Sequence, residues 1–590
     1  MHRILFRGGL VMTDAYQVPA VLDLLVGDGT ILDVRADLDP ADADEVHDLQ
    51  ADFVLPAFVD AHAHVTETAL LMTGVDLSTC RSVDDVLFHV DLQSRKNPGS
   101  PILGHGWDEL ALAERRPPTA SEIERRVPGR IVYLSRVDVH SAVVSRTLAD
   151  RAGLSGLPGW DGSGRVERDA HHAARDWTRS RIRPAARERL QRAALRAALE
   201  QGIAYVHEMS APHVAPEDDL VSLVTLPDDG DPRPRVVPYR GTLVADAAEA
   251  RDLAKRFRER GVDLAGLAGD LVVDGAVGSR TARFHADYHD APGHRGHLYL
   301  DAEQIGAHVA ACTRAGLQAG FHVIGDAAVT EVVEGFALAA ADVGADAIRA
   351  ARHRLEHVEA VTGRDVARLA ALGVLASVQP AFDAAWGGPG GMYATRLGPA
   401  RAAGLNPFAG FAAAGVGADA VRAGRHRLEH VEAVTERDVA RLAALGVLAS
   451  VQPAFDAAWG GPDGMYATRL GPGRAAGLNP FARFVAGGVP LALGSDSPVT
   501  PFDPWGAVRA GVLHREPAHR ISMSQALHAH TAGGHLAAGR DGGVLRPGAE
   551  ATFTVWRSVE EKPGLPDLGV GEEPPECVMT VVAGRIGRVG

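Results

Sequence analysis

The sequence predicts an α/β fold, a (β/α)8 barrel to which both chain ends add a small β-sandwich. Three observations support this prediction. Helix-like and strand-like segments alternate through the middle of the chain, β-rich segments lie at both ends, and reactive side chains follow several predicted strands. With 590 residues the chain is long enough for a barrel, which typically takes about 250 residues, and for a second domain.

The composition excludes several other classes of protein. A hydrophobic content of 46% and a charged content of 23% are typical of a globular protein. The net charge of −15, without any basic block, argues against nucleic acid or a membrane as a partner. Because no run of 18 apolar residues occurs and the first residues do not resemble a signal peptide, we expect neither a membrane span nor export. The three cysteines lie far apart and suit a reducing compartment, so we expect a cytoplasmic protein.

Short strands and turns are predicted at both chain ends. Residues 21–36 contain Asp28-Gly29 between two apolar runs, a typical signal of a β-hairpin. The segment 542–590 shows similar apolar runs separated by turn residues. The predicted division is therefore a composite β-sandwich domain, residues 1–55 plus 540–590, and a barrel, residues 56–539.

The middle of the chain repeats a helix-then-strand unit. Residues 182–202 read as a helix that stops at Gly202, and an apolar strand follows at 203–206. The same order recurs at 302–323 and at 364–380. Such units favour a parallel sheet, and over so long a stretch they favour a barrel, with a doubly wound sheet as the alternative. No GxGxxG sequence follows a strand, which argues against a dinucleotide-dependent oxidoreductase.

One segment of the chain occurs twice. Residues 343–415 recur at 416–488 with only eight differences. Two copies do not make a solenoid, so we interpret them as a tandem duplication inside a domain. A misassembled sequence is the alternative, and the scattered differences weigh against it. Since an eight-stranded barrel needs one sixth and one seventh strand, one copy is expected to form an extra subdomain.

The strongest chemical signal lies in LPAFVDAHAH. An apolar strand at 54–59 runs into Asp60, His62 and His64. Side chains two residues apart on a strand point to the same side, so the two histidines can bind one cation. This position directly after an apolar strand makes a metal site more plausible than two incidental histidines.

Further candidate ligands follow later predicted strands. His322 lies in HVIGD, His357 lies in RLEH and recurs as His430, and Asp496 lies in GSDSP. The carboxyl ends of barrel strands meet at one face, so these side chains are expected to converge. Imidazoles together with a carboxylate suit zinc and similar divalent cations.

The ordered set HxH, DGAVGSRTA, HVIGD, RLEH and GSDSP resembles the amidohydrolase superfamily. Within it the chain is similar to amidohydrolase family 3, the branch that includes N-substituted formamide deformylases. GHGWDE at 104–109 and RVDVHS at 136–141 also look like that branch, and the resemblance covers nearly the whole chain. It implies a barrel joined to a β-sandwich of both termini, and hydrolysis of a C–N bond in a small amide, formamide or N-acyl compound.

The resemblance also implies a metal site. His62 and His64 would hold one divalent metal together with Asp496. His322 and the histidine of RLEH would hold a second metal or orient the substrate. Zinc is the expected metal, with one or two ions per chain.

Catalytic roles follow from the same resemblance. Asp496 would act as the general base towards a water activated by the metal, and His140 or the metal would stabilise the oxyanion. The residues expected to contact the substrate are Trp107, Asp108 and Arg280.

The chain departs from the family pattern at the metal bridge. Many members carry a lysine on the fourth strand, where this chain has Asp270. Glu208, at the end of the preceding predicted strand, resembles the glutamate of some other superfamily members. We therefore expect either a mononuclear site or a binuclear site bridged by Asp270 or Glu208.

The duplication leaves the sixth strand open. The first copy ends in small residues at 410, 412 and 414. From this we predict that the first copy carries the site, with His357, and that the second copy is extruded from the barrel; the alternative is that His430 of the second copy lies in the site.

The alternative functions are a deaminase, another C–N or C–O hydrolase, or a non-catalytic binding protein. We expect a small-molecule substrate, and a homodimer is possible.

Several other histidines do not have the spacing of metal ligands and are expected in surface or loop positions: His171, His172, His207, His213, His285, His289, His294 and His297.

Overall fold

The fold is known from a computed structural model of the whole chain. The residues that the structure describes are 2–109, 111–137, 141–212, 215–268, 271–351, 353–372, 374–377, 392–402, 405, 427–429, 439–440, 442–443, 448–459, 467, 476–495, 497, 501–537, 541–557, 568 and 573–588.

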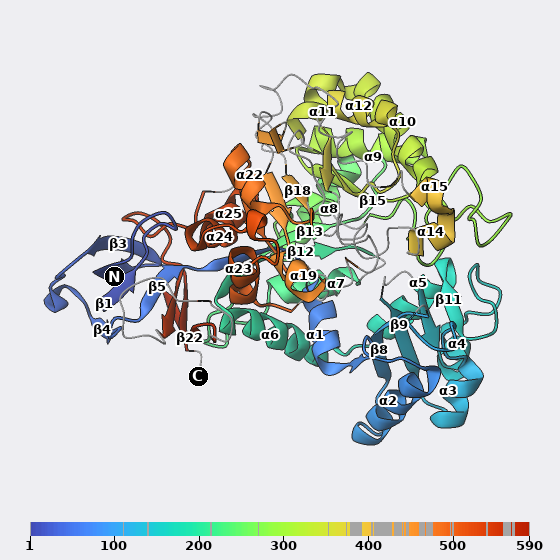
Figure 1. Cartoon of the computed structure of the whole chain (residues 1–590), viewed down its shortest axis with the longest axis horizontal. Coiled ribbons are helices and arrows are strands. Elements are labelled where there is room, and N and C mark those ends of the chain that lie inside the picture. Colours follow the sequence, from blue (N-terminus) through green and yellow to red (C-terminus); the bar gives the residue numbers. More distant parts are fainter. Residues whose placement is uncertain are drawn as a thin grey trace.

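A curled parallel sheet forms the centre of the molecule (Figure 1). Seven strands follow one another in the order β6, β12, β13, β14, β15, β16, β17, and every neighbouring pair is parallel. Helices separate most of them in the sequence, as the helix-then-strand rhythm predicts. Their bounds are β6 (Phe58–Ala63), β12 (Ile203–Ser210), β13 (Arg235–Arg240), β14 (Gly266–Leu267), β15 (Gln318–Val323), β16 (Arg354–His357) and β17 (Leu375–Ser377).

Three more parallel strands continue this arrangement. They are β18 (Arg427–Glu429), β19 (Leu448–Val451) and β20 (Leu491–Leu493), in that order. A parallel bridge between Ala63 and Ser497 joins the segment after β20 to β6, and β17 lies beside β18. The predicted α/β fold is thus confirmed, whereas closure into a barrel of eight strands stays a prediction. The described strands include β16 and β17 from the first copy and β18 and β19 from the second, so both copies contribute to the sheets.

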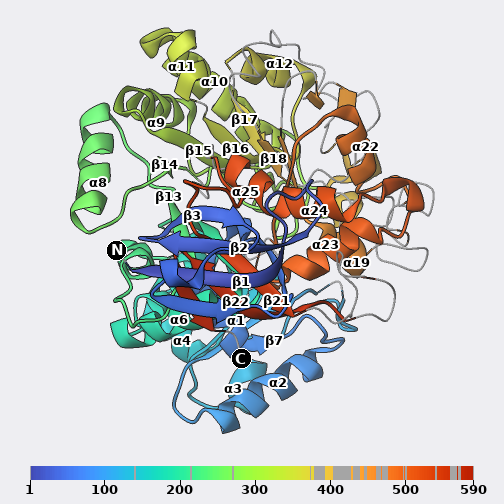
Figure 2. The same ribbon diagram turned by 90° about the vertical axis from the view of Figure 1, so that its left-hand side faces the viewer.

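Strands from both chain ends form a separate sheet. β5 pairs antiparallel with β21, which joins the N-terminal and C-terminal strands (Figure 2). Asp28 and Gly29 both have positive φ, 48° and 76°, between the paired residues Gly27 and Thr30. This confirms the predicted hairpin, because two such residues match the twist of the flanking strands. The eight strands are β1 (Arg3–Val11), β2 (Ala20–Gly27), β3 (Thr30–Arg35), β4 (Glu45–Asp48), β5 (Phe53–Pro56), β21 (Phe553–Arg557), β22 (Glu576–Val582) and β23 (Arg585–Arg588).

A third sheet lies between β6 and β12 in the sequence, and the sequence analysis did not predict it. It has five strands in the order β11, β10, β9, β8, β7, and it packs its own apolar clusters, separate from those of the central sheet. We call residues 75–179 the inserted unit (Figure 1, lower right). Its strands are β7 (Val75–Asp76), β8 (Ile102–Trp107), β9 (Val132–Arg136), β10 (Ser141–Val144) and β11 (Arg165–Glu167), and its helices are α2 (Val83–Lys96), α3 (Ala120–Arg126), α4 (Arg146–Ala152) and α5 (Arg168–Arg179).

Helices surround the central sheet, and aromatic residues join it to the terminal sheet. The Trp505 ring lies 5.9 Å from the Phe58 ring and 5.4 Å from the Trp556 ring, centroid to centroid. Among the helices whose residues the structure describes, none has both the length and the apolar character of a membrane span. The remaining helices are η1 (Pro40–Asp42), α1 (Val65–Thr73), α6 (Pro184–Glu200), α7 (Glu217–Val224), α8 (Ala247–Glu259), α9 (Ala302–Ala315), α10 (Asp326–Val343), α11 (Ala345–Ala351), α12 (Gly363–Ala371), α14 (Met392–Leu397), α15 (Pro399–Ala402), α19 (Pro453–Trp459), α22 (Phe481–Gly487), α23 (Pro504–Val512), η2 (Pro517–His519), α24 (Met523–His530) and α25 (Ala532–Ala537).

Candidate active site

The carboxyl end of β6 meets the segment that follows β20. Asp60 is fully buried and accepts a hydrogen bond from the Ser495 hydroxyl. The backbone N–H of His64 donates to the Ser497 carbonyl at 3.3 Å. The residues on both sides of Asp496 are therefore held against the strand end that carries the HxH sequence.

Glu208 on β12 lies at the same strand end. It is 4% exposed and opposite Ala63 in the parallel register of β12 and β6. Its carboxylate accepts a hydrogen bond of 2.7 Å from the backbone N–H of Val65, the residue after His64. A buried carboxylate is thus fixed next to the predicted metal ligands of β6.

His322 on β15 is buried next to the chain that follows β14. Its backbone N–H donates to the Leu271 carbonyl at 2.8 Å, and its Nε2 lies 3.4 Å from the Gly275 carbonyl oxygen. On the other side, Val323 is opposite His357 in the register of β15 and β16. The structure therefore brings the backbones of the predicted ligands His322 and His357 onto neighbouring strands.

Asp274 fixes the loop of the DGAVGSRTA sequence to the end of β15. The side chain is completely buried. Burial raises the pKa of Asp274 to about 7, against three backbone N–H donors that stabilise its charged form. The donors are the N–H groups of Arg283, Ile324 and Gly325, at 2.7, 2.8 and 2.8 Å.

Two polar side chains of this loop bond within the protein. The Arg280 guanidinium donates two hydrogen bonds to the Asp290 carboxylate, one of 3.0 Å from Nε and one of 2.8 Å from Nη2. The Thr281 hydroxyl accepts from the backbone N–H of Ala276 at 3.0 Å and is buried. The described partner of the Arg280 side chain is therefore Asp290, and a contact between Arg280 and the substrate stays a prediction.

Trp107 and Asp108 lie at the end of β8 in the inserted unit. Trp107 is 1% exposed, and its indole N–H donates to the Leu134 carbonyl at 2.8 Å. It belongs to the apolar core of that unit. Asp108 accepts a hydrogen bond of 2.7 Å from Arg136 and remains partly exposed. Substrate contacts of both residues stay predictions.

Several predicted residues lie outside the described part of the chain. They are His140, His213, Asp270, His430 and Asp496, together with the side chains of His62 and His357. Within the described residues, no group of three or more His, Cys, Asp or Glu side chains is arranged to hold a metal ion. The full ligand set is therefore a prediction.

Some buried polar residues were missed or misplaced by the sequence analysis. His171 and His207 are each 1% exposed, so the expectation of surface positions is wrong for them. Helix α5 turns His171 inward, where its Nε2 lies 2.9 Å from the Tyr133 hydroxyl. The ion pair of Glu109 and Arg396 could not be predicted from the sequence, because the two residues are 287 positions apart and come together only in the folded chain.

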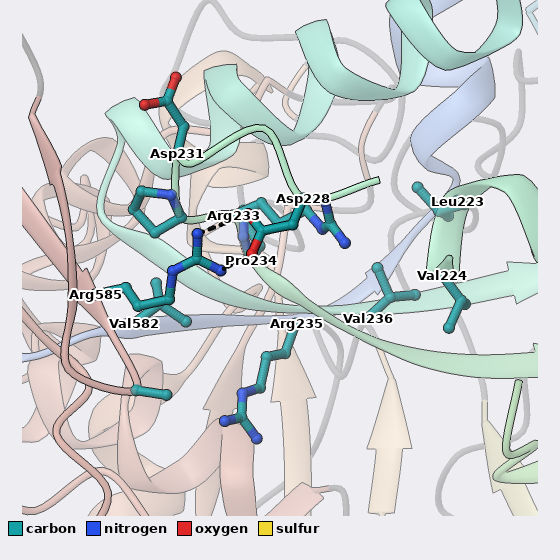
Figure 3. A pocket seen from close by; sticks show the side chains of 12 residues that line it. Leu223, Val224, Asp228, Asp231, Arg233, Pro234, Arg235, Val236, Val582 and Arg585 are labelled. Atoms are coloured by element: carbon teal, nitrogen blue, oxygen red, sulfur yellow. Dashed lines mark hydrogen bonds and ion pairs between the residues drawn. The ribbon is translucent and has the colours of Figure 1, made fainter. Parts of the chain in front are cut away.

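A hollow with a volume of about 440 Å³ lies near the amino end of β13 (Figure 3). Asp228 and Arg585 form an ion pair of 2.7 Å beside it, and Val224 and Val582 also line it. Active sites of α/β barrels lie at the opposite end, where the strands terminate. This hollow is therefore not the candidate active site.

Parallel strands with buried histidine and carboxylate side chains at their carboxyl ends are the arrangement in which α/β enzymes carry their active sites. The chain belongs to the amidohydrolase family: the family model matches residues 45–418 and 409–587. This confirms the resemblance seen in the sequence, and with it the expected class, a hydrolase of the amidohydrolase type.

Two curated relatives and one solved structure are similar to the chain. The protein LONG AFTER FAR-RED 3 of Arabidopsis thaliana is 26% identical over 61% of this chain, and the match spans 62% of that protein's length. N-substituted formamide deformylase of Arthrobacter pascens is 30% identical over 144 residues, which are 24% of this chain and 26% of that enzyme.

The solved structure is that of an uncharacterized metal-dependent hydrolase from Pyrococcus horikoshii OT3. It aligns with 97% of this chain and 100% of its own, with 20% identity and a TM-score of 0.60. At this identity the likeness supports the shared fold.

Proposed function

We propose that the chain is a metal-dependent hydrolase that cleaves a C–N bond in a small amide, formamide or N-acyl compound. One observation carries the proposal. The strand end with the HxH sequence is hydrogen-bonded both to Glu208 of β12 and to Ser497, next to Asp496. This arrangement supports a site in which imidazoles and carboxylates from separate strands would meet at the face where α/β barrel enzymes act.

The donor set fits a divalent cation. Glu208 and His322 are buried, and histidine nitrogens with carboxylate oxygens are the ligands that zinc accepts. His62, His64, His322, His357 and Asp496 would hold one or two ions, bridged by Glu208 or Asp270. A cation bound there supplies Lewis acidity, which makes water nucleophilic near neutral pH.

The protein residues then have separate tasks. Asp496 would take the proton from the attacking water and deliver it to the leaving nitrogen. His140 would donate a hydrogen bond to the carbonyl oxygen as negative charge develops on it. Glu208 suits the bridging role, because its carboxylate is fixed beside β6 by the Val65 N–H.

The first copy of the repeat supplies the better candidate for the sixth strand. β16, which contains His357, pairs directly with β15, which contains His322. β18, the corresponding strand of the second copy, pairs with β19 instead. The division of the family match into 45–418 and 409–587 also supports one surplus copy.

Metal content per chain, measured by elemental analysis, tests the proposal. We expect one or two equivalents of zinc or a similar metal, lost in His62→Ala and retained in His285→Ala, an exposed histidine. His357→Ala is expected to lose metal or activity, whereas His430→Ala is not.

A screen of formamides and N-acyl compounds for hydrolysis follows. Release of an amine indicates an amide hydrolase, whereas release of ammonia indicates a deaminase. Absence of bound metal, and of uptake from added salts, would sink the proposal.

A further inference from the structure

Six charged side chains form an alternating chain between the inserted unit, the 275–290 loop and the first copy of the repeat. We call it the charge chain. Its central residue is Arg396, which donates to Glu109 at 2.9 Å and to Asp290 at 2.6 Å. In order, its members are Asp108, Arg136, Glu109, Arg396, Asp290 and Arg280.

The middle of the charge chain is buried, whereas its two ends are partly exposed. The side chains of Arg136, Arg396 and Glu109 are 2%, 4% and 8% exposed. The pKa of Glu109 lies below its usual value: burial opposes this shift, and it is outweighed by the charge and hydrogen bond of Arg136, a backbone hydrogen bond and the charge of Arg165 acting together. Arg396 is one of two arginine partners of both Glu109 and Asp290. Its removal leaves each carboxylate with a single arginine and the group with an excess negative charge, which is costly in a medium of low dielectric constant.

Arg396, on helix α14, binds two other segments at once, the inserted unit and the 275–290 loop. Besides the two carboxylates, its Nε donates to the Gly278 carbonyl at 3.1 Å. Glu109 follows β8 of the inserted unit, and Arg136, its other partner, ends β9 four residues before His140. Arg396 therefore links the segments that carry predicted substrate and oxyanion contacts to helix α14.

The repeat offers an internal comparison. Arg396 lies in GMYATRL at 391–397, and the same seven residues recur at 464–470 with Arg469. Arg469 lies outside the described residues, and it offers a control substitution that is matched to Arg396 in local sequence.

We propose that Arg396 is a positioning residue that makes the first copy the functional one, by fixing the inserted unit and the 275–290 loop against α14 beside the active site. The reaction that it serves is the one proposed above. Helix α14 also packs Met392 and Tyr393 against Ala276, Val277 and Tyr288 of the loop. This apolar contact does not depend on Arg396. Replacement of Arg396 is therefore expected to loosen the inserted unit without unfolding the first copy.

Hydrogen exchange of the full-length protein tests the proposal in Arg396→Met and in its matched control Arg469→Met. Peptides covering 102–109 and 132–137 are expected to exchange at least about 10-fold faster in Arg396→Met, because local opening follows the loss of buried contacts. The same peptides should exchange at the wild-type rate in Arg469→Met, and a peptide from β1 should not change in either variant. Equal effects of the two substitutions, or no effect of Arg396→Met, would overturn the proposal.

Kinetics and metal content separate positioning from general stability. With a substrate from the screen, Arg396→Met is expected to lower kcat/KM about 100-fold at unchanged metal content, since small displacements of oriented groups have effects of this size. Arg396→Lys keeps the charge but has a single nitrogen, so it should recover only part of the activity. A lower Tm with unchanged kcat/KM in the folded protein would contradict a positioning role. If the wild type binds no metal and turns over nothing, the proposed function fails, and the exchange comparison still decides the role of Arg396.

Discussion

A buried carboxylate behind the active site makes a pH-dependent contribution to stability. Asp219 on α7 is 5% exposed and accepts a hydrogen bond of 2.8 Å from Thr66 on α1, the helix that follows the HxH sequence. Burial raises its pKa from 3.8 to about 6. The folded state therefore binds the proton more tightly than the unfolded chain, so this contribution is fully present below about pH 4 and is lost as the pH rises to about 6. The loss corresponds to about 3 kcal/mol.

Thermal unfolding of the wild type and Asp219→Asn between pH 4 and 8 measures this effect. The asparagine carries no charge and can still accept from Thr66, so the wild type should lose stability relative to Asp219→Asn as the pH rises to 6. Asp218→Asn is the matched control, because Asp218 is the exposed neighbour on the same helix. Parallel profiles of the wild type and Asp219→Asn would show that Asp219 has an ordinary pKa in the folded protein.

Residues of the candidate site differ in how far the sequence could predict them. His64 and His322 could be found because each follows a local apolar strand, and a strand end fixes where its next side chains lie. Arg396 could not, since the same seven residues occur in both copies and its partner Glu109 lies 287 positions away in the sequence.

The junction of α6 and β12 requires a glycine, which can be tested by substitution. Gly202 has φ +73°, and a Cβ atom there would lie 2.5 Å from Cζ2 of the buried Trp556. Gly202→Ala combines backbone strain with overpacking and is expected to lower the free energy of unfolding by about 3 kcal/mol. Chemical denaturation of both proteins measures the difference.

Gly153→Ala is the control that isolates backbone strain. Gly153 ends α4 with φ +66°, and a Cβ atom there would meet nothing within 4 Å. This substitution should cost only about 1 kcal/mol. Equal losses at the two positions would mean that the Trp556 side chain moves aside freely and that the contact does not fix β12 against the terminal sheet.

Helices and strands could be predicted from the sequence where a few neighbouring residues determine the local backbone. The stop of α6 near Gly202 and the Asp28-Gly29 hairpin each depend on backbone preferences of a few residues. The inserted unit was missed because its strands β7, β8 and β9 are parallel and separated by helices, the same rhythm that a barrel shows. Its separate core is a tertiary property, and β7 has only two residues.

At the scale of the whole molecule, the central sheet and the three strands that continue it contain ten described parallel strands, where an eight-stranded barrel needs eight. The surplus equals the two strands that one repeat copy supplies. β16 of the first copy pairs with β15, and β19 of the second copy pairs with β20. Because residues 375–377 and 448–450 have the same sequence, LAS, we expect β17 to pair with β20 when β19 is absent.

Removal of one copy is therefore expected to preserve the protein. Deletion of residues 416–488 joins Gly415 to Val489 and leaves one strand of each kind, and deletion of 343–415 gives a chain that differs from it only at the eight variable positions. Both variants should retain the wild-type metal content and unfold at an equal or higher Tm, because fewer strands must close the same sheet and a shorter loop costs less entropy. Deletion of 270–342, an equal length that removes β15 and His322, should abolish folding. Loss of metal or of cooperative unfolding in both single-copy variants would mean that the ten strands act together, and that the duplication has become part of the fold.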